Sequence, residues 1–264
     1  MPESFIPLLA ALAYLSATGG LVRSLRDGRT QNRAVLWFAL PAIFLHAAAH
    51  GLDWAQLHGP DLHFFAALSL VGLGMAALST LAAGTQRMEA LGVVVYPLAA
   101  FLLLLYHFAG HSHAEALGWR LQLHAWLALL AYATLGVAAL IAVMLWFQER
   151  ALRRHQLRGW LRALPPLVQL EGLLFLSLAA SFVLLTLALI TGVMFVENLL
   201  AQHLWHKTVL SFLSWIVLAV LLFGRWRFGW RGPRAVKLTL TSMLLLLLAF
   251  FGSKFVLEML LQRG

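Results

Sequence analysis

The sequence predicts an all-α membrane protein, a polytopic bundle of about eight transmembrane helices with both termini on the extracytoplasmic side. Of the 264 residues, 62% are hydrophobic and only 11% are charged, whereas a soluble domain has about 45–50% apolar and about 25% charged residues. The apolar residues recur in runs near the roughly 20 residues that a helix needs to cross the hydrocarbon layer. We expect one transmembrane domain over residues 1–264.

Short polar segments separate the apolar runs and define the expected spans. The spans cover about 4–22, 34–52, 63–84, 91–109, 121–147, 170–193, 206–224 and 238–259. The first run has no Lys or Arg before it, and Arg23 and Arg26 follow it. A secretory signal peptide has the opposite order, so we expect this run to be retained as a helix.

The positive charges predict the orientation in the membrane. With both termini outside, only four of the 19 basic residues lie in outer segments, namely Arg120, Lys207, Lys254 and Arg263. The others lie in inner loops, as the positive-inside rule requires. This pattern indicates a multi-pass plasma-membrane protein, as in a bacterial inner membrane. The net charge of +9 is spread between apolar runs, which argues against a nucleic-acid partner.

The sequence lacks the residues and motifs that several kinds of site and reaction require. There is no cysteine, which excludes disulfides, thiolate metal sites, covalent haem attachment by this chain and dithiol redox chemistry. HExxH and GxSxG motifs and paired intramembrane aspartates are also missing, so we do not expect an enzyme. Metal or redox chemistry would have to use histidine.

The histidines are distributed unevenly across the membrane. In the predicted topology only His155 is inside, and the other ten of the 11 are at the outer side: His46, His50, His58, His63, His107, His111, His113, His124, His203 and His206. This asymmetry indicates a function at the outer face.

His46 and His50 stand out within this group. Their spacing of four residues places both on one helix face, with His46 roughly 9 Å below the helix end near Leu52. An ionisable group at such depth is a functional hypothesis by default, and an interhelical hydrogen bond is the competing interpretation. His124 opens the fifth span and His206 opens the seventh, so two further helices present imidazoles near the same surface.

Neutral imidazoles from two helices can hold a haem iron axially from both sides, and they also bind zinc, copper or nickel. The 17 Phe and 10 Trp residues offer an apolar slot. Arg120, Lys207 and Lys254 are outer cations for haem propionates, although Lys254 also has Glu258 one turn later as an ion-pair partner.

Two other function classes stay open. A divalent metal-ion transporter, or an accessory subunit of one, would use the same histidines, but such pathways usually place carboxylates inside the membrane, and no acid lies in the middle of a span here. A regulatory membrane scaffold would act through the basic inner loops.

Four segments carry a resemblance to a known family. They are LHAWLALLAYATLGVAALIAVMLWFQERALRR (123–154), LPPLVQLE (164–171), WHKTVLSFLSWIVLAVLLFGRWRFGWRG (205–232) and FGSKFVLE (251–258), with a looser match at LHAAAH (45–50). With them the sequence resembles the integral membrane cytochrome c assembly family, in its shorter CcsA/HemX-like branch. The resemblance implies a membrane protein that binds or handles haem, whose larger relatives pass haem to apocytochromes outside the membrane.

The resemblance also implies site residues. His124 matches the outer histidine that opens a span, His46 is similar to the deeper histidine of span two, and Trp205, His206 and Lys207 are a remnant of the Trp-rich motif. We therefore expect bis-histidine haem b near the outer face. The expected site consists of axial His46 and His124, alternates His206, His50 and His107, and surrounding Arg120, Lys207, Lys254 and Trp205. Haem and a membrane or extracytoplasmic protein are the expected partners, and no oligomeric state is indicated.

Overall fold

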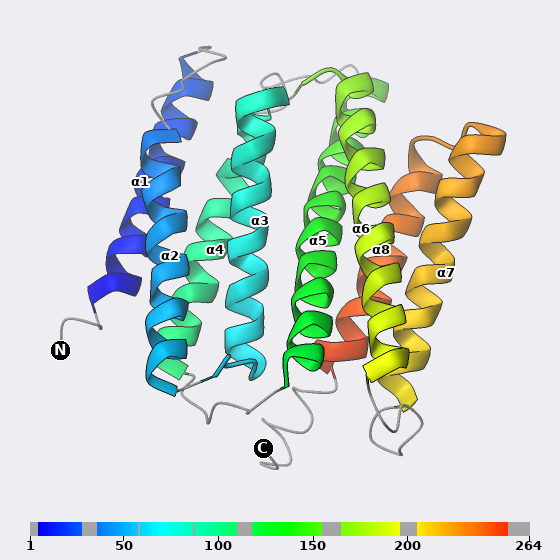
Figure 1. The fold of residues 1–264 in the computed structure, drawn as a ribbon. Helices are drawn as coiled ribbons and strands as arrows, with labels where there is room; N and C mark the ends of the chain where they lie inside the picture. Colours follow the sequence, from blue (N-terminus) through cyan, green and yellow to red (C-terminus); the bar gives the residue numbers. More distant parts are fainter. Residues whose placement is uncertain are drawn as a thin grey trace. The chain divides into compact units, whose positions relative to one another are not determined.

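A computed structural model describes residues 5–27, 36–57, 59–86, 88–109, 118–154, 165–195 and 205–252. These ranges form α-helices and contain no strand, which confirms the predicted all-α bundle (Figure 1). The helices are α1 (Phe5–Arg26), α2 (Leu36–Leu57), α3 (Phe64–Gln86), α4 (Glu89–Ala109), α5 (Trp119–Arg153), α6 (Leu167–Phe195), α7 (Trp205–Phe228) and α8 (Pro233–Leu247), which continues into the π-helical turn η4 (Leu248–Gly252).

Seven of these helices are long and apolar enough to cross a membrane. The exception is α2, because His46, His50 and Asp53 lower the hydropathy of its described residues. Helix α5 has 35 residues, more than the roughly 20 that a span requires. It extends past the predicted end at residue 147 because the Arg-containing end can lie in the polar membrane interface.

The chain divides into two compact units. Unit 1 comprises Met1–Ala116 and Ala151–Pro166, and unit 2 comprises Leu117–Arg150 and Leu167–Gly264. In unit 1, α1 packs on α2 and α4, and α3 packs on α4. Gly72 permits the close approach of α3 to α4, since a Cβ atom there would lie 3.1 Å from Leu102 Cδ1 and 3.4 Å from Ala99 Cα. Small residues have this role in many membrane helix pairs.

Hydroxyl groups join the helices of unit 2. Ser214 on α7 and Ser242 on α8 are fully buried, with their Oγ atoms 2.7 Å apart. Ser181 on α6 donates to the carbonyl of Ala131 on α5 at 3.3 Å. Tyr132 on α5 donates to the carbonyl of Leu246 on α8. Such bonds satisfy polar side chains that would be costly to leave unpaired in hydrocarbon.

A tight turn connects α7 to α8. Gly229 and Gly232 have φ angles of 64° and 54°, a region that glycine adopts readily. This backbone folds Trp230 back over Gly224, whose carbonyl accepts a hydrogen bond from the Trp230 N–H at 3.2 Å. A Cβ atom at Gly224 would lie 2.3 Å from Trp230 Cε3, so the tight packing of this turn requires a glycine.

We predict that Gly224→Ala lowers the thermal stability of the purified protein, with a cost of about 1–3 kcal/mol, because the new methyl group must displace the Trp230 ring. Thermal unfolding in detergent measures the change. Gly172→Ala on α6 is the matched control, since nothing lies within 4 Å of a Cβ atom there. Equal melting temperatures for Gly224→Ala and Gly172→Ala would contradict the packing described.

Candidate functional site

His46 lies at the centre of a polar cluster in unit 1. Its side chain is completely buried, and both ring nitrogens have hydrogen-bond partners. Nε2 is 2.9 Å from Ser69 Oγ on α3, and Nδ1 is 3.3 Å from the Tyr14 hydroxyl on α1. Helix α2 thus presents His46 to two neighbouring helices, and each helix supplies one hydroxyl.

His50, one turn further along α2, shares a partner with His46. Its Nε2 is 3.0 Å from the same Ser69 Oγ. Its ring stacks on Tyr106 of α4 with centroids 4.6 Å apart, and Tyr106 donates a hydrogen bond to Asp53 Oδ2 at 2.6 Å. The predicted placement of both histidines on one helix face is therefore present, and it brings an acid and a tyrosine into the cluster.

The segment before α3 adds a second acid and a third imidazole. His63 Nδ1 is 2.6 Å from Asp61 Oδ1, and Asp61 is buried. The His63 ring centroid lies 5.8 Å from that of Tyr106. Nε2 of His63 is buried and has no hydrogen-bond partner among the described residues.

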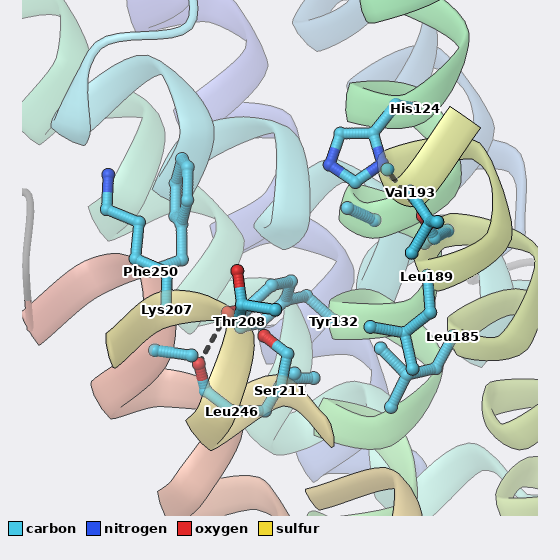
Figure 2. Close-up of a pocket in the computed structure, with 14 residues that line it drawn as sticks. His124, Tyr132, Leu185, Leu189, Val193, Lys207, Thr208, Ser211, Leu246 and Phe250 are labelled. Atoms are coloured by element: carbon cyan, nitrogen blue, oxygen red, sulfur yellow. Dashed lines mark hydrogen bonds between the residues drawn. The ribbon is translucent and has the colours of Figure 1, made fainter. Parts of the chain in front are cut away.

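His124 defines a separate site in unit 2. Its Nδ1–H donates to the carbonyl of Ala188 on α6 at 2.8 Å, which leaves the lone pair of Nε2 available. In Figure 2 one ring nitrogen of His124 makes the hydrogen bond drawn as a dashed line, and the other ring nitrogen points to the opposite side. Gly192 makes room for the ring, because a Cβ atom there would lie 3.0 Å from His124 Cε1.

The pocket beside His124 has a volume of about 190 Å³. Its walls are apolar apart from a few side chains, and Lys207, Thr208 and Ser211 of α7 lie among its lining residues (Figure 2). An apolar groove of about 390 Å³ lies between α6 and α7. The groove and the pocket have three lining residues in common, Leu189, Val193 and Thr208. The pocket and the groove together provide an extended apolar surface next to an imidazole.

The other predicted site residues lie elsewhere. Trp205 and His206 open α7, with ring centroids 6.4 Å apart, and neither lines the pocket. The Arg120 guanidinium lies 5.6 Å from the Trp119 ring centroid and 5.8 Å from that of Phe195. His107 has its ring against that of its neighbour Phe108. The prediction for Lys254 falls outside the described residues.

The structure therefore groups the predicted residues as two sets, His46 with His50 in unit 1 and His124 with Lys207 in unit 2. Joint ligation by His46 and His124 stays a prediction, since the two residues belong to different units. Within the described ranges, no group of three or more His, Asp or Glu side chains could hold a metal ion. Sequence reasoning missed Ser69, Tyr14 and the Ala188 carbonyl, which a hydropathy pattern does not distinguish from ordinary packing positions.

Comparison with known proteins agrees with a helical membrane protein. A model of the cytochrome c assembly protein family matches residues 62–261. The inner membrane protein YpjD of Escherichia coli K12 is 34% identical over 258 residues, which cover 94% of this chain and 96% of YpjD. The cytochrome c biogenesis protein CcsA of Prochlorococcus marinus MIT 9215 is 34% identical over 92 residues, 33% of this chain and 29% of CcsA. No solved structure matches the chain.

The fold and the comparison define a multi-pass helical membrane protein of the inner-membrane type. One histidine, His46, is buried within it, and another, His124, lies at an apolar pocket. The chain belongs to the cytochrome c assembly protein family and is related to CcsA. This confirms the resemblance that the sequence segments predicted.

We predict that the neutral form of His124 carries its proton on Nδ1, because the Ala188 carbonyl can only accept a hydrogen bond. Nitrogen-15 NMR of histidine-labelled protein in lipid nanodiscs reports the tautomer of each ring. The His124 signal is identified by its disappearance in His124→Gln. A proton on Nε2 would contradict the geometry of the site.

Proposed function

We propose that the protein binds haem b in the pocket of unit 2, with His124 as an axial ligand of the iron. The observation that supports this best is the hydrogen bond from His124 Nδ1–H to the Ala188 carbonyl at 2.8 Å. Histidines that bind metals almost always donate their second ring N–H to such an acceptor, which orients the ring and makes the ligating nitrogen more basic. Nε2 of His124 is therefore oriented by this hydrogen bond and can offer its lone pair to a metal.

The surroundings suit a porphyrin better than a bare ion. The pocket of about 190 Å³ can take only part of a porphyrin, but the adjoining groove extends the apolar surface to Ile190, Phe212 and Trp215. A flat apolar macrocycle can use this combined surface. A hydrated divalent cation would need several oxygen or nitrogen ligands. Among the described residues that line the pocket, His124 is the only His, Asp or Glu.

Lys207 is the cation that we assign to a haem propionate. It lines the pocket from the first turn of α7, and Figure 2 shows it beside Phe250, across the view from His124. Thr208 and Ser211 on the same helix add hydroxyl groups. When bound, haem supplies an iron that can change oxidation state, and the residues of this chain bind and orient it.

The second axial position has no assigned residue within unit 2. The sequence predicted His46, but both of its ring nitrogens are hydrogen-bonded, to Tyr14 and Ser69. Ligation by His46 would require one of these bonds to break. We therefore propose only His124 as a ligand of the iron. The proposed function is haem binding, and no catalytic step is proposed. The family membership and the relation to CcsA support haem as the cofactor.

We predict that the purified protein takes up hemin and shows a Soret band, and that His124→Ala weakens hemin binding. The loss should exceed the roughly 10–100-fold that changes outside the first ligand shell cost. Absorbance titration with hemin measures the affinity. His107→Ala is the matched control, because this ring packs on Phe108 and does not line the pocket.

Other results of the hemin titration, or of a metal analysis of the purified protein, would contradict the proposal. A protein that contains zinc, cobalt or nickel without porphyrin would favour the metal-ion transporter. A protein that binds neither haem nor metal would favour the regulatory scaffold. Normal hemin binding by His124→Ala would remove His124 from the site even if the protein is haem-binding.

We predict a smaller effect for Lys207→Gln. A single ion pair at a partly exposed position contributes about 0.2–1 kcal/mol, so hemin affinity should fall roughly 1.4- to fivefold without a shift of the Soret maximum. Lys237→Gln on α8 is the charge-matched control, since Lys237 does not line the pocket. Equal hemin affinities for the two variants would contradict the assignment of Lys207 to a haem propionate.

A further inference from the structure

The polar cluster of unit 1 contains more than helix packing requires. The helices of unit 2 are joined by simple hydroxyl pairs such as Ser214 and Ser242. Unit 1 instead buries the imidazole of His46 with Ser69 and Tyr14, and it places a second, half-buried imidazole, that of His50, on the same serine. Ionisable side chains within a membrane are expensive and usually functional. Apolar side chains could fill the same volume, so this arrangement indicates a use for the imidazoles.

Ser69 couples the two histidines of this cluster. His46 Nε2 and His50 Nε2 lie 2.9 Å and 3.0 Å from the same Oγ atom. A hydroxyl has one hydrogen to donate. Ser69 can donate to one imidazole only, so it must accept a hydrogen bond from the other. In the neutral state one Nε2 therefore carries a proton and the other does not.

The same reasoning extends to Tyr14. When His46 carries its proton on Nε2, its Nδ1 accepts from the Tyr14 hydroxyl, 3.3 Å away. When the proton is on Nδ1, the imidazole donates to Tyr14 and accepts from Ser69. The hydrogen bonds that join Tyr14, His46, Ser69 and His50 can thus reverse together, which is the arrangement that passes protons along a chain.

Acidic groups lie at one end of this chain. Tyr106 stacks on His50 and donates to Asp53. Asp61 and His63 form the pair described above. The rings of His63 and His50 both lie against Tyr106, with centroid distances of 5.8 Å and 4.6 Å, so the Asp61–His63 pair adjoins His50 at this tyrosine. This end of unit 1 corresponds to the outer face in the predicted topology.

We infer that unit 1 contains a proton-transfer chain that runs from Asp61 and His63 at the outer face through His50 and Ser69 to the buried His46. A proton that arrives at His50 releases a different proton from His50 Nε2 to Ser69 Oγ, and Ser69 passes its own hydrogen to His46 Nε2. His50 and Ser69 each gain one proton and lose one, and His46 at the end of the chain gains one, so the step needs no oxidant or reductant.

Side chains from the neighbouring helices enclose the proton-transfer chain. Tyr14 of α1 lies at its deep end and stacks on Tyr96 of α4, with centroids 5.9 Å apart. Ser69 of α3 bridges the middle, and Tyr106 and Asp53 flank His50 near the outer end. The inference uses residues of unit 1 only, and it does not depend on haem in unit 2.

The rate of hydrogen exchange at His46 tests the chain. Full-length protein with nitrogen-15-labelled histidine is placed in lipid nanodiscs and transferred to D2O, and NMR follows the replacement of the His46 ring N–H by N–D. A positioned proton carrier accelerates transfer by roughly 100- to 10,000-fold in enzymes. We therefore expect Ser69→Ala to slow His46 exchange by at least about tenfold, while Ser69→Thr, which keeps a hydroxyl, retains most of the rate.

Controls separate a relay from a packing role. Ser79→Ala removes another buried hydroxyl of α3, which bonds only to carbonyls of its own helix, at Met75 and Ala76, and it should leave the exchange rate unchanged. A purely structural Ser69 predicts unchanged or faster exchange in Ser69→Ala, since looser packing admits water, and that result would overturn the inference.

A second variant covers the case in which Ser69→Ala does not fold. Asp61→Asn changes the outer end, outside the packed centre of the cluster, and should slow exchange at both His50 and His46. Unchanged rates at both rings in Asp61→Asn would also overturn the chain. So would loss of the Soret band in His46→Ala with hemin, because His46 would then be an iron ligand.

Discussion

The membrane interior requires every buried polar group to find a partner within the protein, and both units are organised by this requirement. In unit 1 the imidazole of His46 is placed between Ser69 and Tyr14. In unit 2 the imidazole of His124 is held by the Ala188 carbonyl. The two rings are held differently, because both nitrogens of His46 are hydrogen-bonded, whereas His124 is held through Nδ1.

Close helix packing makes these arrangements possible. Gly72 lets α3 approach α4, and Gly192 leaves space for the His124 ring against α6. A side chain at Gly192 would push the imidazole away from the Ala188 carbonyl and change the direction of Nε2. The glycine therefore acts on the site through the position of the histidine, although it has no chemistry of its own.

The match to the cytochrome c assembly protein family includes parts of both units. A pocket with one prepared histidine suits a cofactor that is held and oriented, and a separate chain of imidazoles suits the movement of protons. The proposed haem site lies in unit 2 and the proposed proton-transfer chain in unit 1. The proposed haem site and the proposed proton-transfer chain can be tested independently.

The sequence alone determined the helical fold, because apolar runs follow directly from the thickness of the membrane. It also determined the family, through four segments that resemble its members. It also singled out His46 and His124. Only the tertiary structure showed that Ser69 couples His46 to His50, and that Ala188 orients His124. A serine hydroxyl or a backbone carbonyl has no periodic signature, so its role is decided by which helices pack together.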